Sequence, residues 1–209
     1  MKSLNLRLLL TLLPVLISFG CQTPRPDSSA SDAAASDNTK VATTRSFDEK
    51  IDRYSAGDVE YNGLYNNFEY KATLLNSYVR EAQITKRAEY YQWNESQTSI
   101  EREKSNQEMS SQTKVFMAFF TPNAKNDNLV EDKSIWKLYL DASGRRYEGK
   151  VKRIRTLLAE QQSLFPFMTR WATPYEITFD VPTSAIERGP SVFTVTGPLG
   201  ARAVNFNAL

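Results

Sequence analysis

The amino-acid sequence predicts a mainly β fold in which one long α-helix lies between the first and second core strands. Seven short segments between residues 68 and 206 have strand character, and turn residues separate them. In one of these segments, 175–181, apolar and polar residues alternate strictly, as in a strand with a single buried face. Many short strands with frequent turns are typical of antiparallel sheets. We therefore predict an antiparallel β-sandwich of the immunoglobulin-like type.

The first two expected core strands differ in how many of their faces are apolar. Residues 68–74 alternate between apolar and polar side chains, which predicts a half-buried strand. Residues 113–121 instead carry large apolar side chains on both faces, which predicts a central strand. Pro122 ends this strand, because proline cannot donate a hydrogen bond to the ladder.

The later strands are expected to form hairpins. Ser143 and Gly144 supply a turn, so residues 145–154 are predicted to return as one strand beside 135–142. The remaining strands are expected at 175–181, 191–196 and 201–206.

The expected helix covers about residues 77–110. This stretch contains no glycine or proline, and it follows Asn76, a residue type that caps helix N-termini well. Four of its apolar residues can lie on one stripe, which is interpreted either as the cover of a sheet or as a docking surface for a partner protein. The stripe consists of Val79, Ala82, Tyr90 and Trp93.

Residues 1–20 have the organisation of an export signal. Lys2 and Arg7 precede an apolar run over 8–17, and the small residue Gly20 closes the segment. The run is shorter than the roughly twenty residues that a bilayer-spanning helix needs. We expect this segment to be removed from the mature protein.

The residues around Cys21, directly after Gly20, resemble the lipobox of bacterial lipoproteins. The family usually has leucine three residues before the cysteine and a small residue two before it, where this chain has Ser18 and Phe19. The resemblance implies that Cys21 becomes the acylated first residue of the mature chain and anchors it in membrane lipid. Gln22, in a position where an aspartate favours the inner membrane, implies the outer membrane. The alternative is ordinary cleavage nearby, which leaves Cys21 as a free thiol.

Residues 21–45 are predicted to form the lipidated cysteine and a disordered tether. The tether consists mainly of Ser, Ala, Asp, Thr and Pro, and Val41 is its one large aliphatic residue, so it cannot bury enough apolar surface to fold. Residues 46–209 are long enough for one compact domain and rich in aromatic residues. We expect a single β-sandwich domain there.

The composition excludes several classes of function. The chain has no histidine and one cysteine, which excludes Ser-His-Asp and Cys-His catalysis, histidine-containing zinc sites and an internal disulfide. Without Lys2 and Arg7, the 26 basic residues fall to 24 and equal the 24 acidic ones, so no nucleic-acid partner is expected. Asp127, Glu131 and Asp132 lack the spacing of a calcium loop. No catalytic, cofactor-binding or metal-binding residue is predicted.

One basic cluster is the candidate binding site. It lies within residues 145–155, where Glu148 is the only acid. The cluster could bind phosphates of lipid or an acidic cell-wall polymer. The alternative is that its charges protect an exposed edge strand against pairing with other strands. The six residues are Arg145, Arg146, Lys150, Lys152, Arg153 and Arg155.

Together these features predict a membrane-anchored cell-envelope lipoprotein that binds or supports another envelope component, either a protein or a cell-wall polymer, without catalysis and without a cofactor. The alternative is a carboxylate-dependent envelope hydrolase that acts on cell-wall glycan, because paired carboxylates suffice for glycoside hydrolysis.

Overall fold

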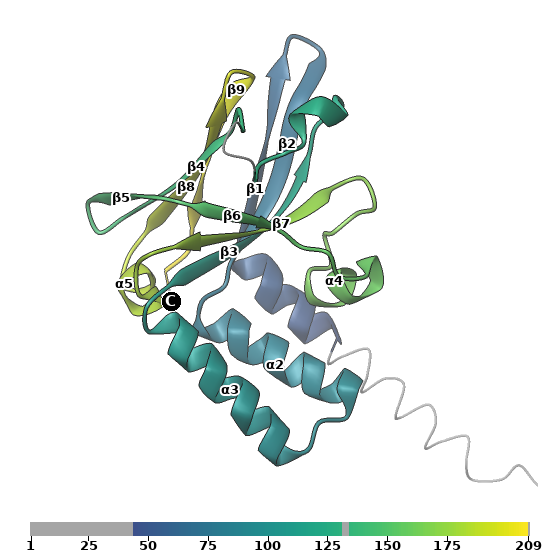
Figure 1. Cartoon of the computed structure of the whole chain (residues 1–209), viewed down its shortest axis with the longest axis vertical. Coiled ribbons are helices and arrows are strands. Elements are labelled where there is room, and N and C mark those ends of the chain that lie inside the picture. The colour runs from purple at the N-terminus through teal and green to yellow at the C-terminus, as the bar shows by residue number, and fades with distance from the viewer. Residues whose placement is uncertain (1–43, 131–133, 209) are drawn as a thin grey trace, which may run out of the picture. The chain divides into compact units, whose positions relative to one another are not determined.

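The computed structural model of the protein describes residues 44–130 and 134–208 (Figure 1). The predicted export signal, Cys21 and nearly all of the predicted tether lie outside these residues. Within the described part of the chain, no helix is long and apolar enough to cross a membrane.

The described strands form two antiparallel sheets, which confirms the prediction of a mainly β, antiparallel fold. The larger sheet has the order β1 (Ser55–Asn62), β2 (Tyr65–Leu74), β3 (Thr113–Phe120), β7 (Thr173–Phe179) and β6 (Lys150–Arg153). The smaller sheet has the order β5 (Arg145–Glu148), β4 (Lys137–Ala142), β8 (Ser191–Gly197) and β9 (Gly200–Phe206). The helical elements are the segment 44–53, α2 (Ser77–Tyr91), α3 (Glu95–Met109), the 3-10 turn η1 (Ala124–Asn126), α4 (Leu158–Leu164) and α5 (Thr183–Glu187).

The main core lies between the two sheets. It is built from alternate residues of strands in both sheets. The apolar residues of the alternating segment 175–181 all belong to it. Phe193 of β8 meets Tyr70 of β2 and Phe179 of β7 edge to face, with ring centroids 5.9 and 6.4 Å apart. These contacts join the inner faces of the two sheets.

A second core covers the outer face of the larger sheet. Phe116 and Ala118 of β3 point to this face, and helices pack on it through Phe47, Val79 and Leu164. The stripe residue Val79 is fully buried, so this part of the stripe covers a sheet. Because β3 is buried on both faces in the middle of the larger sheet, the prediction of a central strand over 113–121 is confirmed.

The prediction of one helix over 77–110 is wrong, because the segment forms the helical hairpin α2–α3 (Figure 1). Gln92 adopts a left-handed conformation with φ 50°, which ends α2. Asn94 then caps α3, and its side chain accepts a hydrogen bond of 2.8 Å from the backbone N–H of Gln97. A capping asparagine with glutamine three residues later is a start signal inside the predicted helix. Arg102 of α3 joins the two helices through a bidentate ion pair with Glu81 of α2.

The prediction of one strand over 145–154 is also wrong. The segment consists of two short strands, of which β5 pairs with β4 and β6 pairs with β7 in the other sheet. The turn at Ser143 and Gly144 is confirmed, since both residues have positive φ, as the tightest hairpin turns require. Gly149 lies where the chain crosses between the sheets. A side chain on Gly149 would overlap the Cγ2 atom of Ile177, so glycine permits this close approach.

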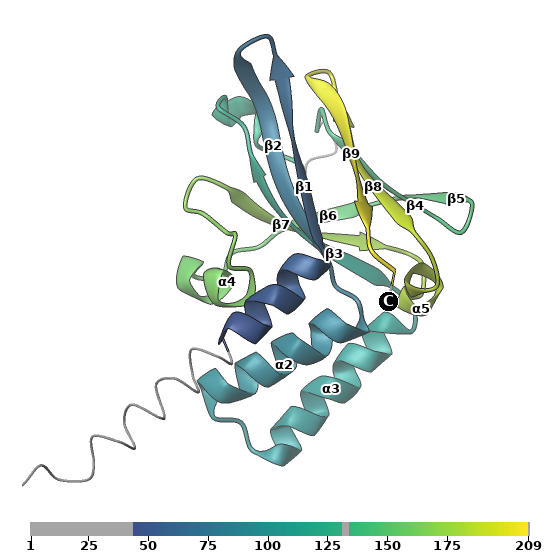
Figure 2. The same ribbon diagram turned by 180° about the vertical axis from the view of Figure 1, so that it is seen from behind.

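Strand β1 was not among the predicted strands. It is an edge strand whose residues are only partly buried, so its apolar alternation is weak. Contacts with neighbouring strands hold β1 in place. One of them is an ion pair of 2.8 Å between Glu60 of β1 and Arg202 of β9. Figure 2 shows β1 beside β9, which brings one edge of each sheet together.

The helical segment 44–53 was not predicted either, and it includes the last two residues of the predicted tether.

Candidate basic cavity

The structure divides the six predicted anion-binding residues into two groups. Arg145, Arg146 and Lys150 lie on the solvent-exposed parts of β5 and β6. Arg146 forms an ion pair of 2.8 Å with Asp141, and Lys150 forms one of 2.6 Å with Asp180. The bond from Arg146 lowers the pKa of the Asp141 carboxyl group. Two of these three charges are therefore already matched by acids on neighbouring strands.

The other three residues, Lys152, Arg153 and Arg155, line a cavity of about 690 Å³ on the outer side of the larger sheet. Arg87 of α2 lines the same cavity. We call this site the basic cavity. Arg87 is sixty-five residues before Lys152 in the sequence, so no local pattern could have added it to the predicted cluster.

The floor of the basic cavity is apolar and aromatic. It includes Phe116 of β3, Ile154 after β6, and Leu164 and Phe165 at the end of α4. The rings of Phe116 and Phe165 stack with an interplanar angle of 4°. The segment after β6 is held in place because Gln161 of α4 donates a hydrogen bond of 2.9 Å to the carbonyl of Thr156. Packing thus fixes the floor, and the chain leaving β6 carries basic side chains to the rim.

Among the described residues that line the basic cavity, four are basic and two are acidic. Within the described residues, none of its four basic side chains has a carboxylate within 4.0 Å. The cavity also includes Glu160 and Glu176, but Glu176 forms an ion pair of 3.5 Å with Lys114. The Nε atom of Arg87 is buried and has no hydrogen-bond partner in the described part of the chain. A buried donor without a partner costs free energy, so the protein leaves the Arg87 guanidinium incompletely satisfied.

A layer of ion pairs lies beside the cavity, between the helical hairpin and the larger sheet. Glu108 of α3 forms two ion pairs, one of 3.0 Å with Lys114 and one of 3.5 Å with Arg80. Burial lowers the pKa of the Arg80 guanidinium, Glu108 and Glu176 raise it, and Arg87 lowers it further. Arg87 lines both this layer and the basic cavity. Glu108 and Glu176 are paired with Arg80 and Lys114, and Glu101 also lines this layer. Among the described residues, no carboxylate lies within 4.0 Å of the Arg87 guanidinium.

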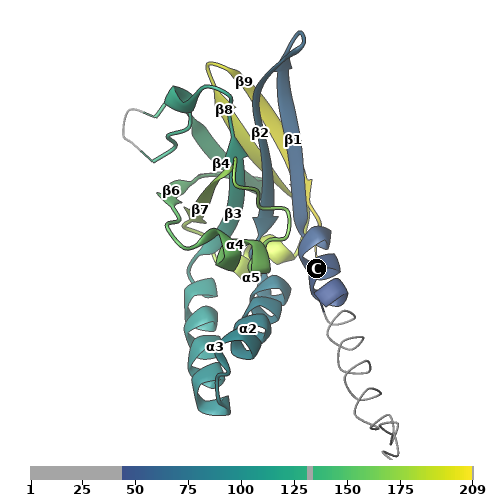
Figure 3. The same cartoon turned by 90° about the vertical axis from the view of Figure 1, so that its right-hand side faces the viewer.

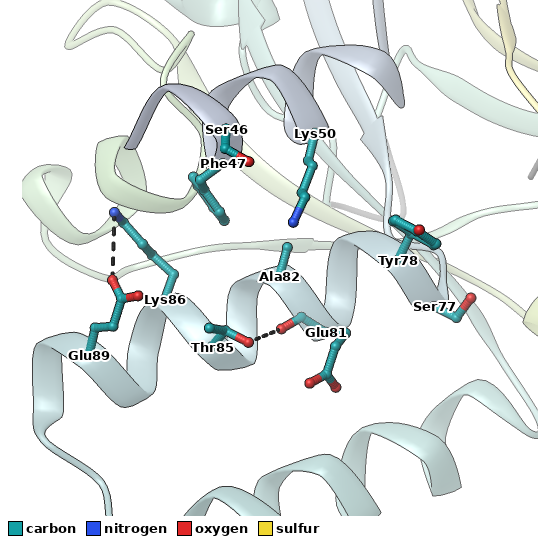
Figure 4. Close-up of a pocket in the computed structure, with 10 residues that line it drawn as sticks. All are labelled: Ser46, Phe47, Lys50, Ser77, Tyr78, Glu81, Ala82, Thr85, Lys86 and Glu89. Carbon is teal, nitrogen blue, oxygen red and sulfur yellow. Dashed lines mark hydrogen bonds and ion pairs between the residues drawn. The ribbon is translucent and has the colours of Figure 1, made fainter. Parts of the chain in front are cut away.

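A second hollow, of about 660 Å³, lies between the segment 44–53 and α2, and we call it the helix groove (Figure 4). Phe47 and Lys50 face Ala82 across it. Its charged side chains are largely matched, because Glu81 binds Arg102 and Lys86 lies 3.9 Å from Glu89. The helix groove is therefore the weaker candidate for a charged ligand.

Asp127, Glu131, Asp132 and Cys21 are the other positions that the sequence singles out. Residues 44–130 and 134–208 contain no group of three or more acidic, cysteine or histidine side chains placed to hold a metal ion. Asp127 accepts a hydrogen bond of 2.7 Å from Thr173. Glu131, Asp132 and the predicted lipid attachment residue Cys21 lie outside the described residues.

The fold and the cavity define a mainly β domain with a ligand-sized hollow on the outer side of its larger sheet. Comparison of the chain with protein-family models, with curated proteins and with solved structures finds no match. What the cavity can bind therefore follows from its own side chains.

Proposed function

We propose that this chain is a membrane-anchored lipoprotein of the bacterial cell envelope, more specifically of the outer membrane, whose domain binds an anionic ligand in the basic cavity without catalysis. The residues around Cys21 support the anchor and the export signal supports the location. We also propose that the two-sheet domain is of the immunoglobulin-like type, which its antiparallel sandwich supports at the level of architecture.

The observation that carries the proposal is the convergence of basic side chains from two distant segments on one cavity. Both β5 and β6 are edge strands, so the interpretation of the cluster as edge protection fits their positions. Edge protection, however, requires only charges along the exposed edge. It gives no reason for Arg87, on a helix, to line the same hollow as Lys152, Arg153 and Arg155.

The chemistry of the cavity selects a phosphate ester that carries an apolar group. Guanidinium groups match phosphate oxygens with paired hydrogen bonds, and three of the four basic residues are arginines. The aromatic floor offers apolar contact to the rest of the ligand. The cavity volume falls within the range of small-molecule sites, roughly 300–1,000 Å³. An acidic phospholipid has both parts.

Two triple variants with the same change of charge test this proposal. The mature chain with Cys21→Ser is titrated calorimetrically with dihexanoyl phosphatidic acid, kept below the concentration at which it forms micelles. Replacing Lys152, Arg153 and Arg155 by Gln should weaken binding about tenfold or more, because hydrogen bonds to charged groups contribute ~1.5–3 kcal/mol each. The same change at Arg145, Arg146 and Lys150 should leave the affinity within about twofold, because exposed ion pairs contribute little.

Salt gives an independent measurement on the same proteins. Binding of the phosphatidic acid should weaken from about 0.1 M to about 1 M salt, as the Debye length falls from ~10 to ~3 Å. If the two triple variants lost the same affinity for phosphatidic acid, or if neither lost any, the result would contradict the proposal and favour edge protection. In that case the variants should self-associate instead, which light scattering detects.

The proposed anchor is tested by the mass of the protein in isolated membranes. The mature chain should begin at Cys21 and exceed the mass of its amino acids by that of several acyl chains, because a single chain gives only marginal membrane binding. Replacing Cys21 by Ser should abolish the added mass. An unmodified chain, or one that begins at another residue, would rule out the anchor.

The alternative function, a carboxylate-dependent hydrolase that acts on cell-wall glycan, stays a prediction from the composition of the chain.

A further inference from the structure

The turn between β1 and β2 exposes apolar side chains at the end of a hairpin. We call residues 61–65 the hairpin tip. Leu64 is 98% exposed, Tyr65 81% and Tyr61 55%. Gly63 has φ +61°, which permits the tight two-residue turn that places Leu64 at its end. Figure 3 shows the hairpin projecting at the end of the sheets away from α2 and α3.

The register of the hairpin distributes these side chains around the tip. Tyr61 pairs with Asn66, and Asn62 pairs with Tyr65. Paired residues share a face of the sheet and successive residues alternate between faces. Tyr61 and Tyr65 therefore lie on opposite faces, with Leu64 at the end between them. The hairpin tip thus carries one aromatic ring on each face, each beside an asparagine, and the leucine at its end.

The base of the hairpin is firmly held. Phe68 is fully buried and meets Trp136 edge to face at 4.8 Å. Asn67 donates a hydrogen bond of 2.9 Å to the carbonyl of Leu199, and its own carbonyl accepts one of 3.0 Å from Thr121. The exposed side chains thus stand on a rigid support, which lowers the entropy lost when they bind a surface.

The surroundings of the tip favour lipid over a protein partner. No charged residue occurs between Glu60 and Glu69, so insertion of the tip would bury no charge. A flat protein surface would cover one face of the hairpin and leave the aromatic ring on the other face in water. A fluid apolar medium surrounds both faces, and tyrosine rings prefer the interface between lipid and water. We propose that the hairpin tip inserts into the interfacial region of a phospholipid bilayer, independently of the basic cavity.

Vesicles of phosphatidylcholine, which carries no net charge, test the proposal on the mature chain with Cys21→Ser. Replacing Tyr61, Leu64 and Tyr65 by Ser should lower co-sedimentation about tenfold or more, because membrane binding scales with buried apolar area. The matched control replaces Tyr78, Tyr91 and Leu157 by Ser, which also removes two tyrosines and one leucine, from exposed positions on other elements. It should leave binding within about twofold. Equal effects of the two triples, or no binding by the parent chain, would overturn the proposal.

Two further readouts separate tip insertion from binding in the cavity. Tip binding should persist from about 0.1 M to about 1 M salt, because no charge is involved, and it should survive the Lys152, Arg153 and Arg155 triple. In Leu64→Trp, vesicles should shift the added tryptophan emission to shorter wavelength relative to the parent chain, and brominated lipid should quench it. Emission that vesicles neither shift nor quench, or binding that high salt abolishes, would show that the tip stays in water.

Discussion

Gly149→Val is expected to lower the free energy of unfolding by about 3 kcal/mol or more, the upper end of the range for overpacked cores. A Cβ atom at Gly149 would overlap Cγ2 of Ile177 and lie 3.0 Å from Cε1 of Phe179. Both of these side chains are fully buried, so neither can move aside without disturbing the main core. The strain falls where the chain passes from β5 in one sheet to β6 in the other.

Urea unfolding of the parent chain and two valine variants measures this effect. Gly189→Val is the matched control, because no atom outside Gly189 and its two chain neighbours lies within 4 Å of a Cβ built there. We expect that variant to stay within about 0.5 kcal/mol of the parent. If both variants lost the same stability, close packing at the sheet crossing would not be the reason for glycine at position 149.

The second large effect is expected from Phe116→Ala, which should cost about 3–5 kcal/mol, as truncation of a buried aromatic side chain usually does. Phe116 is 1% exposed and packs in the second core, where its ring stacks on Phe165. Tyr91→Ala removes an exposed ring and serves as the control. Thermal and urea unfolding should show a large loss for the first variant and almost none for the second.

Phe116→Leu separates the two roles of this residue. Leucine retains most of the buried apolar area and should recover much of the stability that alanine loses. It lacks the flat ring that stacks on Phe165 in the cavity floor. Equal stability of the alanine variant and the parent would contradict the packing described for the second core.

The sequence predicted those strands whose burial differs between their faces. Alternation located β7, and apolar side chains on both faces identified β3 as central, because the hydrophobic pattern directly records which side of a strand is buried. It could not locate β1, an edge strand with partly exposed residues that is held by its neighbours. Pairing with another strand leaves no periodic trace in an edge strand's own residues.

The two corrected elements failed for different reasons. The break in the predicted helix had a local signal, since Asn94 and Gln97 form a recognisable start motif within a helix-favouring stretch. The only sequence signal that the predicted strand 145–154 is divided into β5 and β6 was the glycine at position 149. Whether a glycine marks a bend, a bulge or a crossing between sheets depends on what approaches it, and here Ile177 and Phe179 come from a strand almost thirty residues later.

The candidate site was half predictable. A run of basic residues drew attention to 145–155, but a linear pattern cannot distinguish side chains matched by neighbouring acids from those that line a hollow. Lys152, Arg153 and Arg155 form a site together with Arg87 of α2 and with the apolar floor, to which β3 and the end of α4 contribute. Both contributions arise from tertiary packing.

Anion binding in the basic cavity would be seen directly in a crystal structure of the mature chain, with Cys21→Ser, bound to dihexanoyl phosphatidic acid. We expect phosphate oxygens within ion-pair distance of Arg87 and of at least one of Lys152, Arg153 and Arg155, with the acyl chains against Phe165. A ligand bound elsewhere, or a basic cavity that stays empty at saturating ligand, would contradict this expectation.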